Sequence, residues 1–457
     1  MIKTALAALL LLNLAISGFL GPSPTARSNS SSTLEQVGPS TGSNPCPPLP
    51  PATGATVYVS TVTQLQNALQ DPAPNTTILI ADGTYALGGA NLQIAAPGTT
   101  LRSASGSRDA VVLSGGYTTT EIVQINASNV TIADVTLREA LHHPIHVSTA
   151  EGADTLNTMI YNVRIIDPGQ QAIKINPGLE GGYPDDGVVT CSHIELTDAG
   201  RPLIWEINGS CYTGGVNAHQ ARARTIRDNH IEGFWCQQGL SEHGIHFWRG
   251  CRDTVVERNS LVDNARGIGF GLADSGIART YPDDPCPSAD GGYVDHYGAI
   301  IRNSTVFASR GLLFSSQSGF DCGICLWQAC GAMVLHNTVV STQVPFSSIE
   351  WRFDHTDTGI INNLVSHQLR DRGGTARLSN NLDYQPLDLF MDGLAGDLHL
   401  AGTATAAIDQ GMALDSDLCQ DDFDVDPRPF GPAPDSGADE RVAILNHAIY
   451  VPLILRR

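Results

Sequence analysis

Ionisable and aromatic side chains are concentrated in residues 239–250, which read GLSEHGIHFWRG. Imidazole and charged groups are costly to bury without partners, so packing alone does not account for this density. Imidazoles can transfer protons near neutral pH, and a guanidinium can bind a carboxylate through two hydrogen bonds. The run therefore marks a candidate catalytic or binding site, with hydrogen-bonded structural histidines as the alternative. Its chemically capable residues are Glu242, His243, His246, Trp248 and Arg249.

Lysine is nearly absent from the chain, because Lys3 and Lys174 are the only two lysines. Lys3 lies in a predicted export signal, which leaves Lys174 as the lysine to explain. A lysine flanked by other cations has a lowered pKa, and a lowered pKa favours the neutral amine that a general base needs. Lys174 is therefore a second candidate for proton transfer.

Seven short segments can be aligned as strands that each place one residue on the same outer face. Alternate residues of a strand point to opposite faces, and neighbouring strands lie about 4.8 Å apart. With Ile145, Ile173, Ile245 and their equivalents inward, the outward residues form one column, and His219 and Trp248 lie two residues further along the same face. The predicted column is His146, Lys174, Asn217, His246, Gly269, Leu313 and Glu350.

The elements that must position this column are indicated by a repeated phrase in which an Asn follows a short apolar run. The copies place Asn at 162, 229, 259, 303, 337 and 362; with Ser192 as a substituted copy, the intervals are 30, 37, 30, 44, 34 and 25 residues. β-Branched residues alternate with polar ones, which is typical of strands and disfavours helical repeats. The pattern predicts an all-β fold, a parallel β-helix solenoid, with an Asn ladder of purely structural role at one corner.

Composition divides the chain into five segments. Residues 1–20 are typical of a secretory signal peptide, with a retained anchor as the alternative. We expect a Ser/Pro-rich linker over 21–56, the β-helix over 57–395, an Asp-rich C-terminal cap segment over 396–440 and a tail over 441–457. Thr63 is the predicted N-cap of a short capping helix near the start of the β-helix. Insertions at 177–187, 198–213 and 272–297 are expected to wall a groove.

The ten cysteines indicate the compartment in which the protein is found, and the net charge of −20 limits the classes of partner it can bind. Disulfides persist outside the cytosol, so we expect a secreted, extracellular protein with no membrane span after signal cleavage. Cys322, Cys325 and Cys330 favour disulfides over a metal or redox site, because no second CxxC or histidine pair accompanies them. The negative charge argues against nucleic acid as a partner, and we expect a monomer.

The segment from Ile78 to Tyr85 ends in Asp-Gly-Thr-Tyr and follows the predicted helix. This arrangement resembles the N-terminal cap and first coil of the chondroitinase B and alginate lyase family of secreted polysaccharide lyases. The resemblance implies a right-handed, pectate-lyase-like β-helix that cleaves uronic-acid-containing polysaccharide by β-elimination. That family's calcium carboxylates, its Lys and its Arg-His pair do not map cleanly: this chain has His246-Phe-Trp-Arg249 and Arg266-Gly-Ile-Gly-Phe at the corresponding strands.

β-Elimination requires a base, a cation that neutralises the substrate carboxylate and a donor for the departing oxygen. We expect Lys174 or His246 as the base, Arg249 and Arg266 at the carboxylate, and His219 as a donor or orienting group. The other residues of the predicted site are expected to bind substrate: His146, Asn217, Glu242, His243, Trp248 and Glu350.

A calcium ion is a possible cofactor. The oxygen ligands that calcium prefers could come from four aspartates: Asp421, Asp422, Asp424 and Asp426. The alternative is that they are solvated acidic turn residues, because these carboxylates lack the spacing of a known calcium loop.

Two other functions stay open. One is a noncatalytic secreted or surface carbohydrate-binding β-helix, since fold does not fix function. The other is a glycoside hydrolase on the same fold, such as a polygalacturonase. Its expected Asn-Thr-Asp, Asp-Asp and Gly-His-Gly motifs do not appear in that arrangement, since Asp185-Asp186 lies in a loop.

Overall fold

In the computed structural model, the described residues are 46–283, 286 and 292–442, and all belong to one compact unit. The predicted signal peptide, most of the predicted linker and all but the first two residues of the predicted tail lie outside this part of the chain. No helix among the described residues is long and apolar enough to cross a membrane.

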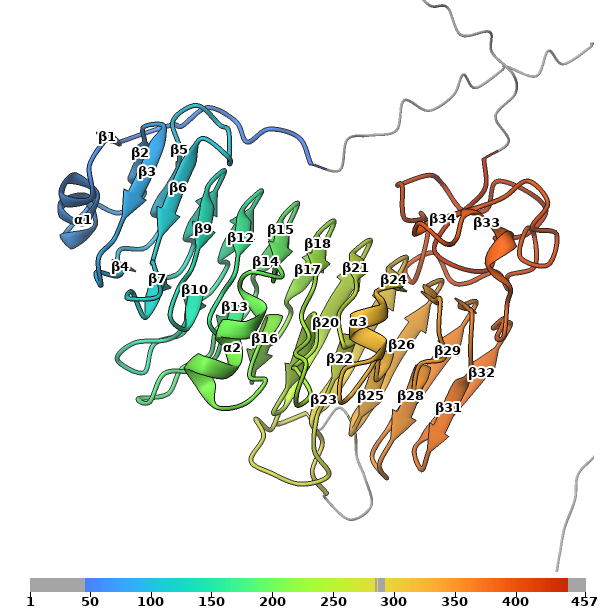
Figure 1. Cartoon of the computed structure of the whole chain (residues 1–457). Coiled ribbons are helices and arrows are strands. Elements are labelled where there is room, and N and C mark those ends of the chain that lie inside the picture. The colour runs from blue at the N-terminus through green and yellow to red at the C-terminus, as the bar shows by residue number, and fades with distance from the viewer. Residues whose placement is uncertain (1–45, 284–285, 287–291, 443–457) are drawn as a thin grey trace, which may run out of the picture. The chain divides into compact units, whose positions relative to one another are not determined.

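The fold is a right-handed parallel β-helix in which the chain winds through three sheets in turn (Figure 1). Sheets I, II and III have 12, 10 and 10 strands, and each strand pairs in parallel with its equivalents one coil before and after. Sheet I consists of β1 (Thr56–Val59), β2 (Thr77–Ile80), β5 (Thr100–Ser103), β8 (Thr131–Ala133), β11 (Met159–Tyr161), β14 (Val188–Thr190), β17 (Thr225–Arg227), β20 (Cys251–Glu257), β23 (His296–Arg302), β26 (Ala329–Leu335), β29 (Asp357–Ile361) and β32 (Thr375–Ser379).

Sheet II follows sheet I in each coil. It consists of β3 (Gly83–Ala86), β6 (Val111–Ser114), β9 (Thr136–Arg138), β12 (Arg164–Ile166), β15 (His193–Glu195), β18 (His230–Glu232), β21 (Ser260–Val262), β24 (Thr305–Ala308), β27 (Thr338–Ser341) and β30 (Leu364–Val365). Sheet III consists of β4 (Leu92–Ile94), β7 (Glu121–Ile125), β10 (His143–Val147), β13 (Gln171–Ile175), β16 (Gly214–His219), β19 (Ile245–Trp248), β22 (Arg266–Phe270), β25 (Cys322–Trp327), β28 (Ser347–Arg352) and β31 (Leu369–Arg372).

The interior of the solenoid is filled by apolar side chains that stack from coil to coil. On sheet III the inward residues Ile145, Ile173, Val216, Ile245 and Ile268 are fully buried and directly paired in register. Burial of such a continuous stack is the main stabilising contribution, because one coil alone cannot bury its own apolar face.

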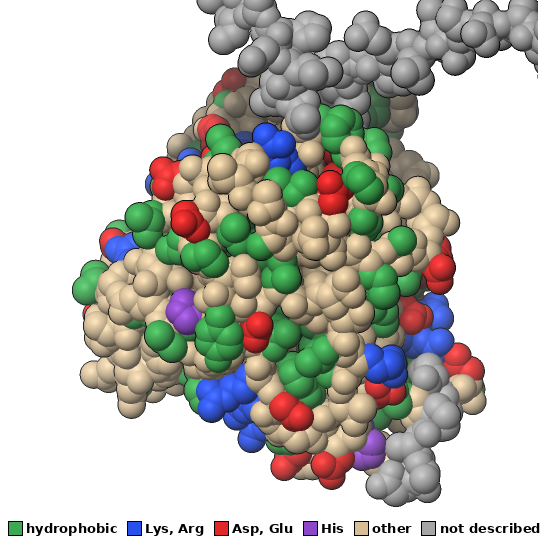
Figure 2. Space-filling view, turned by 90° about the vertical axis from the view of Figure 1, so that its right-hand side faces the viewer, with side chains coloured by type: hydrophobic (Ala, Val, Ile, Leu, Met, Phe, Trp, Pro, Cys, Tyr) green, Lys and Arg blue, Asp and Glu red, His purple; other side chains and the backbone are tan. Residues whose placement is uncertain are grey.

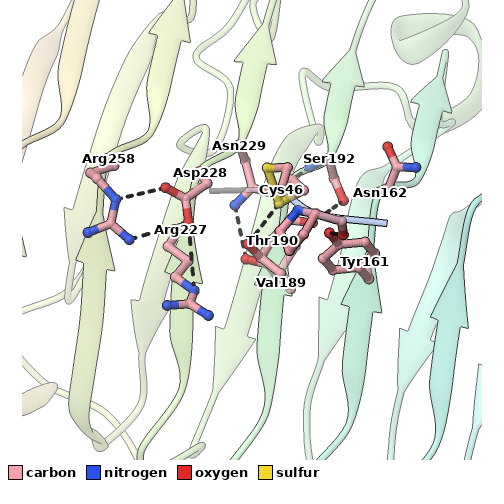
Figure 3. Close-up of a disulfide and its surroundings, with 12 residues drawn as sticks. Cys46, Tyr161, Asn162, Val189, Thr190, Ser192, Arg227, Asp228, Asn229 and Arg258 are labelled. Carbon is pink, nitrogen blue, oxygen red and sulfur yellow. Dashed lines mark hydrogen bonds and ion pairs between the residues drawn. A yellow bond between two sulfur atoms is a disulfide. The ribbon is translucent and has the colours of Figure 1, made fainter. Parts of the chain in front are cut away.

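An amide ladder runs along the corner between sheets I and II, but three of its predicted members, Asn162, Asn303 and Asn362, do not belong to it. Its members are Ser192, Asn229, Asn259, Ser304, Asn337, Asn363 and Asn381, linked by hydrogen bonds of 2.9–3.2 Å. Asn162, Asn303 and Asn362 instead adopt the left-handed conformation, with φ of 47°, 50° and 60°. Asn tolerates that conformation well, so these residues turn the corner; Asn162 is shown in Figure 3.

Four disulfides join Cys46 to Cys191, Cys211 to Cys236, Cys286 to Cys330 and Cys322 to Cys325. Cys251 and Cys419 are free and buried. The Cys46–Cys191 bond attaches the first described residues to the corner of a coil 145 residues later (Figure 3).

Three α-helices lie outside the sheets in the described part of the chain. α1 (Val62–Gln70) covers the N-terminal end, and its N-cap is Thr61, whose side chain accepts a hydrogen bond from the Gln64 amide, rather than the predicted Thr63. The 198–213 insertion contains α2 (Arg201–Asn208). α3 (Gly311–Phe314) replaces one of the seven segments that were aligned as strands.

The C-terminal segment packs on the outer face of sheet II. It contains η1 (Leu387–Leu389) and the antiparallel pair β33 (Phe390–Asp392) and β34 (Asp397–Leu400). Phe390, Leu398 and Leu400 form an apolar cluster with Phe307 and Val340 of sheet II. The face of the molecule turned toward the viewer in Figure 2 mixes charged side chains of both signs with hydrophobic ones.

Candidate functional site

The pairing register of sheet III brings the predicted outward residues into one column. His146 lies opposite Lys174, Lys174 opposite Asn217, Asn217 opposite His246, and His246 opposite Gly269. The next two positions are Cys325 and Glu350. Leu313 was placed in this column wrongly, because it lies in α3 and the strand at that coil is β25.

Lys174 is held by two side chains from the next strand. Its Nζ lies 2.6 Å from Asn217 Oδ1 and 2.9 Å from His219 Nε2, and only 6% of the residue is exposed. Burial lowers the pKa of the Lys174 amine to about 8; the Glu242 carboxylate opposes this change and Arg249 adds to it. A large fraction of neutral amine is therefore present at mildly alkaline pH.

The half-buried His219 and Trp248 and the exposed Arg249 form the outer edge of the same group. The His219 ring meets the Trp248 ring edge-on, with centroids 4.6 Å apart, and the Arg249 guanidinium lies 4.6 Å from the Trp248 ring centroid. Burial lowers the pKa of His219, and the nearby Lys174 and Arg249 cations lower it further. His219 is therefore a neutral imidazole beside Lys174, and Arg249 is the exposed cation.

His246 is fully buried, and acceptors face both of its ring nitrogens. Nδ1 lies 2.9 Å from Glu242 Oε2 and 3.2 Å from Asn217 Nδ2, and Nε2 lies 3.1 Å from the Gly271 carbonyl oxygen. Burial raises the pKa of the Glu242 carboxyl, but His246, Arg266 and Lys174 outweigh it and the net pKa is lowered. A hydrogen-bonded chain thus runs from Lys174 through Asn217 to His246 and Glu242.

His243 lies directly over Gly269, where a β-carbon on Gly269 would meet its ring. The imidazole is fully buried and neither nitrogen has a hydrogen-bond partner. Donor atoms of Glu242, His243 and His246 lie within 4.8 Å of one another, and so do donor atoms of His243, Cys322 and Cys325. The first set could hold a metal ion, and its two imidazoles suit a transition metal better than calcium.

Three other predicted residues are engaged in internal contacts. Arg266 Nε lies 2.7 Å from Asp321, and His146 lies between Glu121 at 2.6 Å and Asn176 at 2.9 Å. Glu350 is fully buried. Its carboxylate accepts hydrogen bonds from Trp327 at 2.7 Å, Ser347 at 2.7 Å and Arg372 at 2.5 Å. Glu350 therefore contributes to packing of the last coils rather than to an open surface.

Tyr212 and Asp295 belong to the site although the strand alignment did not include them. Tyr212 is 38% exposed, and burial raises its pKa, with Gln171, Glu242 and Arg249 close enough to influence it. Asp295 is fully buried and accepts hydrogen bonds from the Arg249 amide and the Tyr293 hydroxyl. Both lie in the predicted insertions, where loop contacts rather than strand alternation decide the position of a side chain.

The four aspartates of the C-terminal segment do not share one site. Asp422 accepts hydrogen bonds from the Asp424, Asp426 and Glu440 amides, and burial raises its pKa to about 7. Asp421 pairs with Arg258 at 2.8 Å, and Asp424 with His399 at 2.9 Å. Calcium takes six to eight oxygen ligands, and these carboxylates do not converge to supply them.

Comparison with known protein families and with curated proteins finds no match. Among solved structures, the pectate lyase Pel9A has a TM-score of 0.54 and 16% identity, covering 85% of this chain and 97% of its own. An alginate lyase from Paenibacillus sp. str. FPU-7 has a TM-score of 0.46 and 18% identity, covering 71% and 97%. Polygalacturonase from Erwinia carotovora ssp. carotovora has a TM-score of 0.43 and 11% identity, covering 73% and 94%.

The chain is thus similar in fold to pectate lyase. The parallel β-helix predicted from the repeats is confirmed, and so is the right-handed form that the family resemblance implied. Identities this low establish the fold and do not carry a reaction to this chain. The chemistry has to be argued from the column itself, which offers a buried amine of lowered pKa, an exposed guanidinium and a half-exposed phenol.

Proposed function

We propose that this protein is a secreted polysaccharide lyase that cleaves uronic-acid-containing polysaccharide by β-elimination on the outer face of sheet III. The observation that carries the proposal is the Lys174 amine, which is buried beside Asn217 and a neutral His219. The exposed Arg249 lies on the half-buried Trp248, which pairs in register with His219. A general base acts best when its pKa lies near the working pH, and burial brings the pKa of Lys174 to about 8.

In the proposed reaction the neutral Lys174 amine takes the proton from C5 of the uronate. The C5–H electron pair forms the C4=C5 double bond, and the C4–O glycosidic bond breaks. Arg249 binds the carboxylate and stabilises the negative charge that develops on it. Tyr212 protonates the departing oxygen, since burial raises its pKa and keeps the phenol protonated. No water is consumed.

His246 and Glu242 act by positioning in this scheme. Because Asn217 bonds to both Lys174 and His246, the pair of His246 and Glu242 fixes the amide that orients the amine. The half-buried Trp248 ring lies parallel to the His246 ring and under the Arg249 guanidinium, so it supports the residue that binds the carboxylate. His219 keeps a neutral acceptor next to the Lys174 amine. His146 lies one coil away and extends the same face.

The net charge of −20 opposes binding of an anionic polymer. Charges separated by more than about 8 Å are largely screened at physiological salt. Arg249, the exposed cation of the site, therefore supplies the local positive potential for a bound uronate. Four disulfides are in keeping with the proposed export. Calcium could assist carboxylate neutralisation, so each assay is run with added calcium and with a chelator.

Hydrolysis is the weaker proposal, because a glycosidase needs two carboxyl groups about 5–9.5 Å apart. Glu242 pairs with His246, and Glu350 lies three strands further along the column, which corresponds to about 14 Å. Glu350 is also enclosed by Trp327, Ser347 and Arg372.

The test is to incubate the protein with alginate, pectate, hyaluronan and chondroitin and to follow the ultraviolet absorbance of unsaturated uronates. Lys174→Ala and His246→Ala should abolish turnover, and Arg249→Ala should lower kcat/KM by about 100-fold or more. Arg377→Ala is the matched control, because Arg377 is an exposed arginine on sheet I. Reducing ends without absorbance would show hydrolysis, and binding without cleavage would show a carbohydrate-binding module; either result overturns the proposal.

A further inference from the structure

A second group of chemically capable side chains lies on the outer face of sheet II. His193 in β15 is directly opposite His230 in β18, and Glu232 lies two residues after His230. Ile194 and Ile231, which separate the outward residues, are fully buried in the core. Strand alternation therefore fixes both imidazoles and the Glu232 carboxylate on the same outward face.

The Nε2 atoms of both histidines face this one carboxylate. His193 Nε2 lies 2.9 Å from Glu232 Oε1, and His230 Nε2 lies 3.6 Å from Glu232 Oε2. The two rings meet edge to face, with centroids 4.9 Å apart. One donor atom from each of the three residues lies within 4.8 Å of the others. Their side chains are 25–40% exposed, so an ion can reach them from solvent.

We propose that His193, His230 and Glu232 form a binding site for a divalent transition metal ion, with Zn²⁺ the best fit. Two imidazoles and one carboxylate are ligands typical of zinc, whereas calcium and magnesium prefer oxygen alone. Bonds of about 2.0–2.2 Å at tetrahedral angles place ligand atoms about 3.4 Å apart. The two nitrogen–oxygen distances, 2.9 Å from His193 Nε2 to Glu232 Oε1 and 3.6 Å from His230 Nε2 to Glu232 Oε2, are each within about 0.5 Å of that value.

The surroundings support the same assignment. His230 Nδ1 lies 3.3 Å from Ser260 Oγ, a contact that orients the ring and leaves Nε2 for a metal. Glu195, opposite Glu232 on β15, is occupied by Arg164 at 2.7 Å and so does not compete for the histidines. Both histidines come from adjacent strands of a rigid sheet, so little reorganisation is needed for binding.

This site is separate from the proposed lyase site. Lys174 and its neighbours lie on sheet III, and His193 and His230 lie on sheet II. With three protein ligands the ion keeps a position open to solvent, which is the arrangement of zinc sites that bind an exchangeable water or ligand. The inference therefore does not depend on whether the protein cleaves polysaccharide.

The experiment is isothermal titration of the full chain, without a polyhistidine tag and stripped with EDTA, with ZnCl₂. The variants are His193→Ala/His230→Ala and Glu232→Gln. His399→Ala tests a competing site, because His399, Asp424 and Asp439 also place donor atoms within 4.8 Å of one another. Titration with Co²⁺, followed by its visible d–d absorption, reports the coordination geometry independently.

Wild type and His399→Ala should bind Zn²⁺ equally at this site. Mutating even the outer-shell partners of a ligand costs about 10–100-fold in affinity, so the double variant should lose at least about 100-fold. Thermal unfolding in EDTA should match wild type, because the replaced side chains are partly exposed. The proposal is overturned if wild type does not bind Zn²⁺, if the double variant binds it unchanged, or if His399→Ala alone removes binding.

Discussion

Lys174→Met tests the central residue of the proposed site by a thermodynamic route that does not depend on knowing the substrate. The native pKa of about 8 lies below the ordinary value of 10.5, so the unfolded chain binds more protons than the native protein between these two pH values. Wild-type stability therefore rises with pH across that window, because the native state no longer carries the cost of a buried charge. Methionine has no such charge and lacks this dependence.

The size of the effect follows from the pKa change. Each tenfold change in proton affinity corresponds to about 1.4 kcal/mol, so the charged Lys174 costs about 3 kcal/mol of stability at pH 7. At pH 9.5 the same calculation gives a destabilisation of about 1.5 kcal/mol from the lowered pKa of Lys174. The hydrogen bonds to Asn217 and His219 are lost in the variant at both pH values. Their loss changes the unfolding free energy of the variant by the same amount at both pH values, so it does not alter the pH dependence.

The assay is urea unfolding of wild type and Lys174→Met at pH 7 and pH 9.5, with the difference in unfolding free energy compared between the two pH values. Lysine labelled with ¹³C at Cε gives the pKa directly by NMR, because Lys3 is the only other lysine in the chain. A difference that stays constant with pH, together with a Cε titration near 10.5, would refute the assignment of Lys174 as a buried amine of lowered pKa.

Three further predictions concern single contacts. Asn337→Ala should destabilise the protein by about 2–3 kcal/mol in urea unfolding, since its buried amide bonds to both neighbouring coils and leaves unsatisfied groups behind. Glu350→Ala should lower the unfolding free energy by about 3 kcal/mol, because it leaves the partly buried Arg372 without its carboxylate partner. Asp357→Ala breaks an exposed ion pair with Arg377 and should lower it by less than about 1 kcal/mol. Tyr212→Phe should lower kcat by about 100-fold, with thermal unfolding unchanged, if the phenol donates the proton.

The fold and the column were predictable from sequence because both depend on strand alternation. An apolar residue in every second position fixes the neighbouring side chain on the outer face, so Ile173 inward places Lys174 outward. The same reasoning failed at Leu313. Gly311-Leu-Leu-Phe314 has the composition of the other segments but forms a single helical turn. The strand at that coil is Cys322–Trp327, which places Cys325 in the column.

The corner residues show a second limit. Asn303 and Asn362 match the repeated phrase as well as Asn337 does, but a residue of left-handed backbone precedes each ladder position. At Asn337 that residue is His336, and at Asn363 it is Asn362. Local composition does not distinguish the two positions. Only the hydrogen bond to the next coil identifies the ladder member.

Burial of the site could not be predicted, because it arises from segments whose own sequences form no regular pattern. On a bare solenoid the outer column would be hydrated, and Lys174 would keep an ordinary pKa. The 198–213 insertion, tied to the next coil by Cys211–Cys236, places Tyr212 and Thr213 beside Glu242, and Asp295 of the third insertion holds Arg249. Burial is the largest cause of the lowered Lys174 pKa. The insertions therefore help to lower that pKa, whereas the strands place the residues of the column next to one another.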